Sequence, residues 1–204
     1  MVRNTDLVWG WPAKGLHWIA ALFILLLLAH GWWMTHMAPR PERLAHYAGH
    51  SAMGFDLLAL MVLRLLWRWL NPVPALPADS KTWERWSAHA VHFGMYVLIF
   101  VVSLTGWVTA NTFRTPITRD LFGIPFPLIA SGVDRSVGNL FEQSHMVLAD
   151  VLGALAVVHV LGALRHHLFK GNDVLRRMTW GCAPHKLQCD QPGQIPGLNR
   201  FTPI

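Results

Sequence analysis

Apolar residues gather in four long stretches along the chain, and short segments rich in proline or charge separate them. Each stretch holds about 20 residues, the length that an α-helix needs to cross the hydrocarbon core of a bilayer. The four stretches are residues 16–36, 50–70, 90–110 and 145–169. The pattern therefore predicts an all-α membrane protein, built as a bundle of four transmembrane helices.

The segments between the stretches predict where the chain turns. Pro39 and Pro41 indicate a short turn between the first two helices, and the prolines of residues 71–77 indicate a stiff connection before the third. The longest connection, residues 111–144, is expected to fold over one end of the bundle. Residues 134–143 are expected to form a short surface helix that leads into the fourth span.

Composition and charge agree with a membrane location. Of the 204 residues, 53% are hydrophobic and only 14% are charged, and the mean hydropathy is +0.33. Most of the lysines and arginines lie before the first span, between the second and third, and after the fourth, so the positive-inside rule places both termini in the cytoplasm. These basic residues frame apolar spans instead of forming a soluble basic patch, so we expect no nucleic-acid partner.

The end of the chain has a different character. Residues 1–178 are expected to form the transmembrane domain, and residues 179–204 an irregular cytoplasmic tail. The tail contains Cys182 and Cys189, the two cysteines of the chain. Together with His185 they supply three of the four ligands of a metal site, but free thiols in a reducing compartment are the preferred interpretation. No C-x-x-C-H motif occurs, so any haem is held non-covalently, as a b-type group.

Histidine spacing gives the main indication of function. His145 and His159 are fourteen residues apart in the last apolar stretch, which is nearly four helical turns and about 21 Å along the axis. One face of one helix therefore presents an imidazole near each side of the membrane. Ionisable residues inside a span are costly and usually functional, and imidazole is a common axial ligand of haem iron.

Alternating span directions allow the histidines to be paired by depth. His17 and His159 fall near the cytoplasmic side, whereas His50 and His145 fall near the outer side. Each pair is a candidate bis-histidine site for one haem b between helices of the bundle. Two imidazoles leave the iron no open position, which suits electron transfer better than oxygen activation.

Other residues near these levels compete for roles. His46 is one turn before His50 and is the weaker candidate ligand, and His30 is expected to be a hydrogen-bonded polar residue. His89 and His92 either contact haem propionates or a quinone, or one of them replaces His17 as ligand. Arg64 and its neighbour Arg68 either neutralise propionates or extend toward the headgroups.

Small and acidic residues within the spans leave two further questions open. Glycines either make room for a macrocycle or let helices pack closely; they are Gly54, Gly106, Gly153 and Gly162. Asp56 and Asp150 lie about one and a half turns inside the outer histidine level. They either relay protons or pair with nearby polar groups.

Several segments together resemble the prokaryotic cytochrome b561 family of four-helix, di-haem inner-membrane proteins. They are KGLHWIAALF at 14–23, GHSAMGFDLLALMVLRLLWR at 49–68, SAHAVHFGMYVLIF at 87–100 and SHMVLADVLGALAVVHVLGALRHHLFKGNDVLRRM at 144–178. The resemblance covers most of residues 11–178. It implies two b haems, with the four axial positions of the family falling on His17, His50, His145 and His159.

The resemblance also implies an activity, namely electron exchange between a periplasmic donor and the ubiquinone pool of the bacterial inner membrane. Some members look like superoxide oxidases, and five arginines expected on the outer side would attract that anion: Arg40, Arg43, Arg114, Arg119 and Arg135. Glu42, Asp120, Asp134 and Glu142 offset most of their charge. The alternatives are a membrane-anchor subunit for a periplasmic redox partner, and a non-redox membrane protein whose histidines are incidental.

Overall fold

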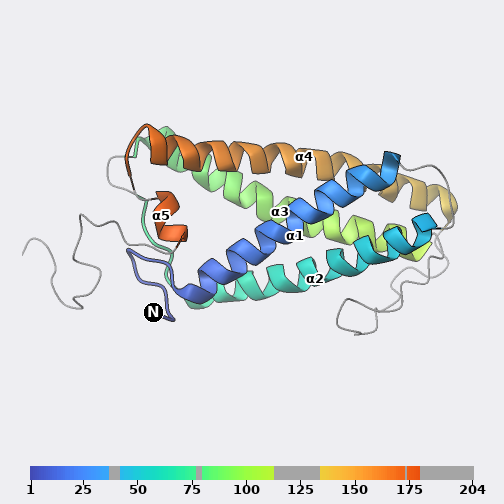
Figure 1. Cartoon of the computed structure of the whole chain (residues 1–204), viewed down its shortest axis with the longest axis horizontal. Coiled ribbons are helices and arrows are strands. Elements are labelled where there is room, and N and C mark those ends of the chain that lie inside the picture. Colours follow the sequence, from blue (N-terminus) through green and yellow to red (C-terminus); the bar gives the residue numbers. More distant parts are fainter. Residues whose placement is uncertain (37–41, 77–79, 113–133, 173, 180–204) are drawn as a thin grey trace, which may run out of the picture.

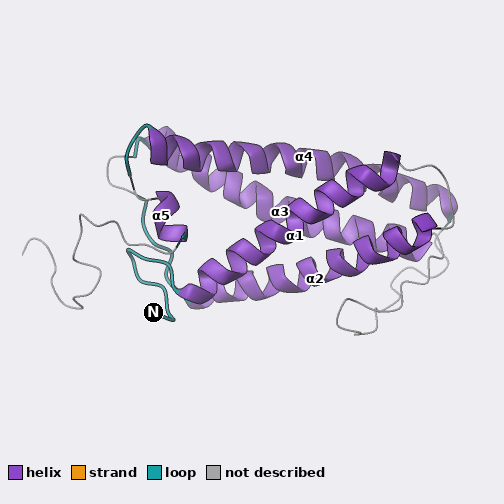
Figure 2. Ribbon diagram, in the orientation of Figure 1, coloured by secondary structure: helices purple, strands orange, loops and turns teal. Residues whose placement is uncertain are grey.

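The computed structural model describes residues 1–36, 42–76, 80–112, 134–172 and 174–179, with four long helices and one short one (Figures 1 and 2). The helices are α1 (Trp11–His36), α2 (Glu42–Leu70), α3 (Thr82–Thr112), α4 (Arg135–Leu168) and α5 (Val174–Met178). Over these ranges the chain contains no strand. The predicted all-α bundle is confirmed.

The long helices extend beyond the apolar stretches from which they were predicted. The clearest difference is at α4, a single helix of 34 residues from Arg135 to Leu168. The separate surface helix expected at 134–143 is wrong, because these residues form the first turns of α4. Asp134 caps the helix, and its carboxylate accepts a hydrogen bond from the Ser136 backbone N–H at 2.7 Å.

Three of the described helices are long and apolar enough to cross a membrane by themselves: α1, α3 and α4. α2 has 29 residues but includes Asp56, Arg64 and Arg68, which lower its average hydropathy. It nevertheless runs beside the other helices along the bundle (Figure 1) and packs against α1 and α3. Leu25 and Leu161 are 63% and 59% exposed in the protein alone, as expected for side chains that face lipid.

The core lies in the middle of the bundle. It consists of small and branched apolar side chains that are at least 93% buried: Ala20, Ile24, Leu57, Met61, Ile99 and Leu152. Leu152 is midway between His145 and His159 along α4, and Ala20 follows His17 by one turn of α1. The apolar core therefore separates the two histidine levels. Consecutive helices pack together, most extensively α3 on α4, whereas α1 touches α4 only sparsely.

One end of the bundle, here called the inner end, holds residues 1–10, the α2–α3 connection and α5 (Figure 1). Asn4 is 5% exposed, and its side-chain amide donates a hydrogen bond to the Pro72 carbonyl at 3.0 Å. Lys14 Nζ donates to the Thr179 carbonyl at 2.9 Å, and Trp18 Nε1 donates to the Met178 carbonyl at 2.7 Å. These contacts bind the N-terminal segment and the end of α5 to the same end of the bundle.

Several sequence-based expectations lie outside the described residues. These are the turn at Pro39 and Pro41, most of the long connection at 113–133, and the tail from residue 180 with Cys182 and Cys189.

The end of the bundle opposite the inner end is here called the outer end. It is the end where α1 finishes at His36 and α4 begins at Arg135.

Candidate functional site

Two pairs of imidazoles face each other across the bundle, one near each end. The ring centres of His17 on α1 and His159 on α4 are 6.2 Å apart, and those of His50 on α2 and His145 on α4 are 6.1 Å apart. Metal–imidazole bonds are about 2.0–2.1 Å long, so two imidazoles on opposite sides of one metal ion have their centres roughly 6 Å apart. Both pairs have the spacing that a bis-histidine haem requires.

Two of these four imidazoles have a buried nitrogen with no hydrogen-bond partner among the described residues, the Nδ1 atoms of His17 and His50. A buried polar atom without a partner costs free energy, so such atoms are uncommon in proteins and usually mark a bound group or water. Each of these Nδ1 atoms is therefore available to a water molecule or another polar group, and the fit to haem rests on the spacing of the rings.

The ring of His145 is held in a defined orientation. Its Nδ1 lies 2.8 Å from the carbonyl oxygen of Val102 on α3. Because a carbonyl can only accept, Nδ1 carries the proton and Nε2 is left unprotonated. Metal-ligating histidines usually make this kind of second hydrogen bond, which fixes the tautomer and aims the other nitrogen at the metal.

Glycines provide the space for the outer imidazoles. A Cβ atom on Gly106 would lie 2.8 Å from Cε1 of His145, and one on Gly31 would lie 3.3 Å from Cε1 of His50. Of the glycines singled out in the sequence, only Gly106 has this role. A Cβ on Gly54 or Gly162 would meet nothing within 4 Å, and one on Gly153 would make an ordinary contact with a leucine. Gly31 was missed because no spacing rule links it to His50.

A third and a fourth imidazole lie near the outer pair. The ring of His30 is 5.8 Å from that of His50 and 5.6 Å from that of His46, so His30 belongs to the outer cluster, whereas it was expected to be only a hydrogen-bonded polar residue. The sequence did not reveal this position, because His46 and His50, which His30 contacts, are on another helix, α2. The described ring contacts of His46 are with His30 and Trp33, whereas His50 is the residue that faces His145.

The inner pair has three further residues nearby. The ring of His92 on α3 is 5.1 Å from that of His159. Arg64 Nε donates to the Tyr96 hydroxyl at 3.0 Å, and Arg64 interacts electrostatically with both His17 and His159. The importance of Tyr96 could not be read from the sequence, because its partner is on another helix.

His89, three residues before His92 on α3, interacts electrostatically with that ring. It lines an open cavity of about 360 Å³ with Thr82, Arg85 and Trp86 at the beginning of α3. The two candidate acids also differ, since Asp56 is 7% exposed whereas Asp150 is exposed on α4.

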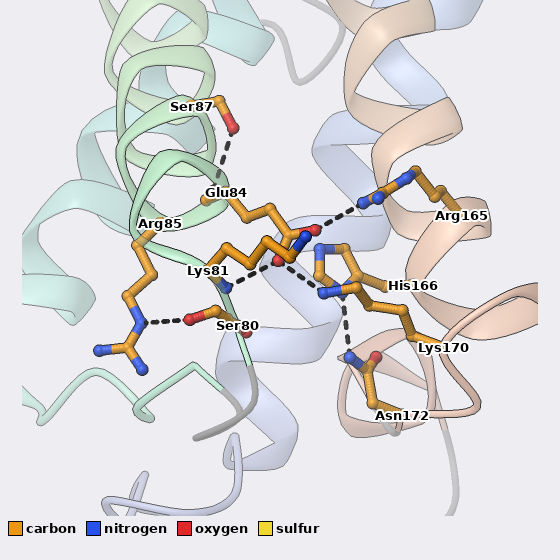
Figure 3. A network of polar contacts seen from close by, with 9 residues as sticks. All are labelled: Ser80, Lys81, Glu84, Arg85, Ser87, Arg165, His166, Lys170 and Asn172. Atoms are coloured by element: carbon orange, nitrogen blue, oxygen red, sulfur yellow. Dashed lines mark hydrogen bonds and ion pairs between the residues drawn. The ribbon is translucent and has the colours of Figure 1, made fainter.

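The inner end is fastened by a buried carboxylate (Figure 3). Glu84 on α3 is 4% exposed and contacts Arg165 Nη1 at 2.7 Å and Lys170 Nζ at 2.6 Å. It also accepts a hydrogen bond from the Lys81 backbone N–H at 2.9 Å, which is one half of a capping box at the start of α3. One side chain therefore begins α3 and ties it to the end of α4.

Charges at the outer end are only partly described. Arg135 is the first residue of α4 and is exposed, whereas Arg40, Arg114, Arg119 and the side chain of Arg43 lie outside the described residues. Hydrogen bonds from the Ser136 hydroxyl and backbone N–H hold the pKa of Asp134 below its ordinary value. Asp134 is therefore ionised at neutral pH and offsets the charge of Arg135.

The described residues form no group of three or more His, Cys, Asp or Glu side chains that could hold a metal ion. Two imidazoles complete a coordination sphere only when another group supplies the remaining ligands, as the four nitrogens of a porphyrin do. The two described imidazole pairs therefore fit a group that brings further ligands of its own, as haem does.

Comparison with known proteins agrees with this chemistry. A family model described as prokaryotic cytochrome b561 matches residues 8–181. Cytochrome b561 homolog 2 of Escherichia coli (strain K12) is 28% identical over 184 residues, which are 86% of this chain and 93% of that protein. The probable superoxide oxidase CybB of Yersinia pestis is 26% identical over 168 residues, which are 80% of this chain and 92% of that protein. The chain, a multi-pass bacterial membrane protein of the cytochrome b electron-transfer type, belongs to the prokaryotic cytochrome b561 family.

Proposed function

We propose that this protein binds two b haems and transfers electrons between a periplasmic donor, superoxide, and the ubiquinone pool. The observation that carries the proposal is the presence of two facing imidazole pairs, 6.2 and 6.1 Å between ring centres, near opposite ends of one bundle. Membership in the family implies haem b. The hydrogen bond between His145 Nδ1 and the Val102 carbonyl, which leaves Nε2 free to bind iron, supports such a group at the outer level.

Each haem would supply one iron that takes up and gives back a single electron. His17 and His159 would hold the inner haem, and His50 and His145 the outer one. The Val102 carbonyl orients His145, and Gly106 lets that imidazole lie against α3. The apolar core between the two levels excludes water and keeps the sites apart. Residues 1–178 would form this functional unit.

His92 is the competing ligand at the inner level, and ring spacing favours His17. The ring centre of His92 is 5.1 Å from that of His159, which is too short for two imidazoles on opposite sides of one iron at about 2.0–2.1 Å each. We therefore assign His92 to the surroundings of the inner haem or of the quinone. Arg64 would serve there as a contact for a propionate, and His89 as a surface residue near the quinone.

The proposed donor and orientation rest on two supports. One relative is named a probable superoxide oxidase, and superoxide is an anion that a periplasmic site would meet. At the inner end, basic residues lie on α4, between α4 and α5, and on α5, among them Arg165, Lys170 and Arg176. By the positive-inside rule this end faces the cytoplasm, so His50 and His145 would lie on the periplasmic side.

Haem content tests the ligand assignment. The purified protein should contain two b haems per chain, and His145→Ala should lose the outer one and His159→Ala the inner one, each leaving about half of the haem absorbance because one of two axial ligands is lost. His36→Ala, which changes an exposed imidazole at the end of α1, is the matched control and should keep both. Retention of both haems in His145→Ala and His159→Ala would contradict the assignment.

Rapid mixing tests the activity. The protein with two haems should be reduced by superoxide and reoxidised by a short-chain ubiquinone, with one electron leaving each superoxide and two needed for each quinol. A protein with both haems that superoxide does not reduce would exclude this donor. A second subunit that purifies with the protein would instead favour the anchor function.

A further inference from the structure

The inner imidazole pair lies beside a permanent positive charge. Arg64 is on α2, and its electrostatic interactions reach His17, His92 and His159. Arginine stays protonated in proteins, so this charge does not depend on pH. Arg68, one turn later on α2, brings a second guanidinium to the same region, 6.0 Å from the ring centre of Tyr96.

Tyr96 holds Arg64 in this place. Its hydroxyl accepts a hydrogen bond from Arg64 Nε at 3.0 Å, and the guanidinium carbon lies 5.7 Å from the centre of the ring. Tyr96 packs against the apolar core, so the aromatic ring is a fixed support on α3. Without it, a long arginine side chain would be free to extend toward the headgroups.

The outer pair has a different electrostatic environment in the described helices. Residues 18–36, 45–63 and 136–164 contain no lysine or arginine. Arg135 is ten residues before His145, about 15 Å along α4, and the ionised Asp134 stands next to it. The two imidazole pairs have similar geometry, but among the residues that the structure describes only the inner pair has a guanidinium fixed beside it.

This asymmetry affects the two haems of the proposed function, on which the inference rests. Reduction adds one negative charge to a haem iron, and a fixed cation nearby stabilises the reduced state, more strongly where the surroundings exclude water. We propose that Arg64, positioned by Tyr96, raises the reduction potential of the inner haem above that of the outer haem. One electron then passes inward downhill, so that the outer iron is oxidised as the inner iron is reduced.

The test is an equilibrium redox titration of the protein with both haems bound, followed by the haem absorbance. His145→Ala, which should retain only the inner haem, identifies its step in the titration. Arg64→Gln should lower the equilibrium constant for reduction of the inner haem about tenfold, which lowers its reduction potential by about 59 mV for one electron. The reduction potential of the outer haem should not change. Tyr96→Phe should also lower the reduction potential of the inner haem, but by less. Arg64→Lys keeps the positive charge and should change this potential least.

Arg176→Gln is the matched control, because it removes one exposed positive charge from α5 and should shift neither haem. If Arg64→Gln fails to retain the inner haem, Tyr96→Phe decides, and an unchanged inner potential in that variant overturns the inference. An inner haem with a lower potential than the outer haem in the unaltered protein also overturns it. Failure of the proposed function looks different, because the unaltered protein would then contain fewer than two haems.

Discussion

At the residue scale, the site depends on how each imidazole is held as much as on the imidazole itself. His145 has a backbone carbonyl to fix its tautomer and a glycine to make room for its ring. His50 has a glycine on a neighbouring helix. An axial ligand has to present one nitrogen in one direction, so these neighbours decide whether a histidine at the right depth can act as a ligand.

Gly106→Ala should therefore damage the outer haem site selectively. The new methyl group would lie 2.8 Å from Cε1 and 2.9 Å from Nδ1 of His145, so the ring has to move away from Val102. We expect the outer haem to be lost in a large fraction of the protein, or its low-spin spectrum to change, while the inner haem stays intact.

Gly162→Ala is the matched control on α4, since its Cβ would meet nothing within 4 Å. It should keep both haems with unchanged spectra. Equal effects of the two substitutions would show that helix propensity, and not the contact with His145, is the cause.

At the element scale, α4 is the element on which both sites are built. It supplies one imidazole to each pair, and it packs most extensively against α3 along its length. Its two ends are fixed in different ways. Asp134 caps its start, and Glu84 on α3 binds Arg165 and Lys170 at and just beyond its end.

Glu84→Gln should loosen the inner end of the bundle. A glutamine keeps the size of the side chain but leaves Arg165 and Lys170 without their shared negative charge. Removing one partner of a buried ion pair is destabilising, because the remaining charge loses its counter-ion. We expect a lower thermal midpoint of unfolding in detergent, followed by circular dichroism, with two haems still bound at low temperature.

Asp134→Asn is the comparison, because asparagine also caps helices well and should change the midpoint little. If Glu84→Gln unfolds at the same temperature as the unaltered protein, the ion-pair network does not fasten α3 to α4.

At the scale of the whole molecule, the two ends of the bundle differ in charge. The inner end has a basic surface and a guanidinium beside its imidazole pair. Among the described residues of the outer end, Arg135 is next to the ionised Asp134. Fixed charges of this kind change the rate at which a charged donor reaches a site, and salt screens the effect.

Two substitutions at neighbouring positions should change the rate with superoxide in opposite directions. Asp134→Asn removes a negative charge from the outer end and should raise the rate up to a few-fold at low ionic strength. Arg135→Gln removes a positive charge and should lower it similarly. Both effects should shrink in about 1 M salt, where the Debye length is about 3 Å.

Reduction of the haems by a quinol is the internal control for both variants and should be unchanged. Equal rates with superoxide for the two variants at low salt would contradict electrostatic steering by this part of the outer end.

The sequence by itself determined the class of the fold and the levels of the histidines. Apolar stretches of about 20 residues and a spacing of fourteen residues are properties of one chain segment at a time, and helix geometry converts them directly into depth. The packing of α1, α2 and α3 around the site was decided only by the tertiary structure. It brings Gly31 and His30 to His50, and Tyr96 to Arg64, because contacts between helices depend on crossing angles and rotations that no single segment encodes. The length of α4 also became clear only in the structure, since the helix begins at Arg135, ten residues before the apolar stretch that predicted it.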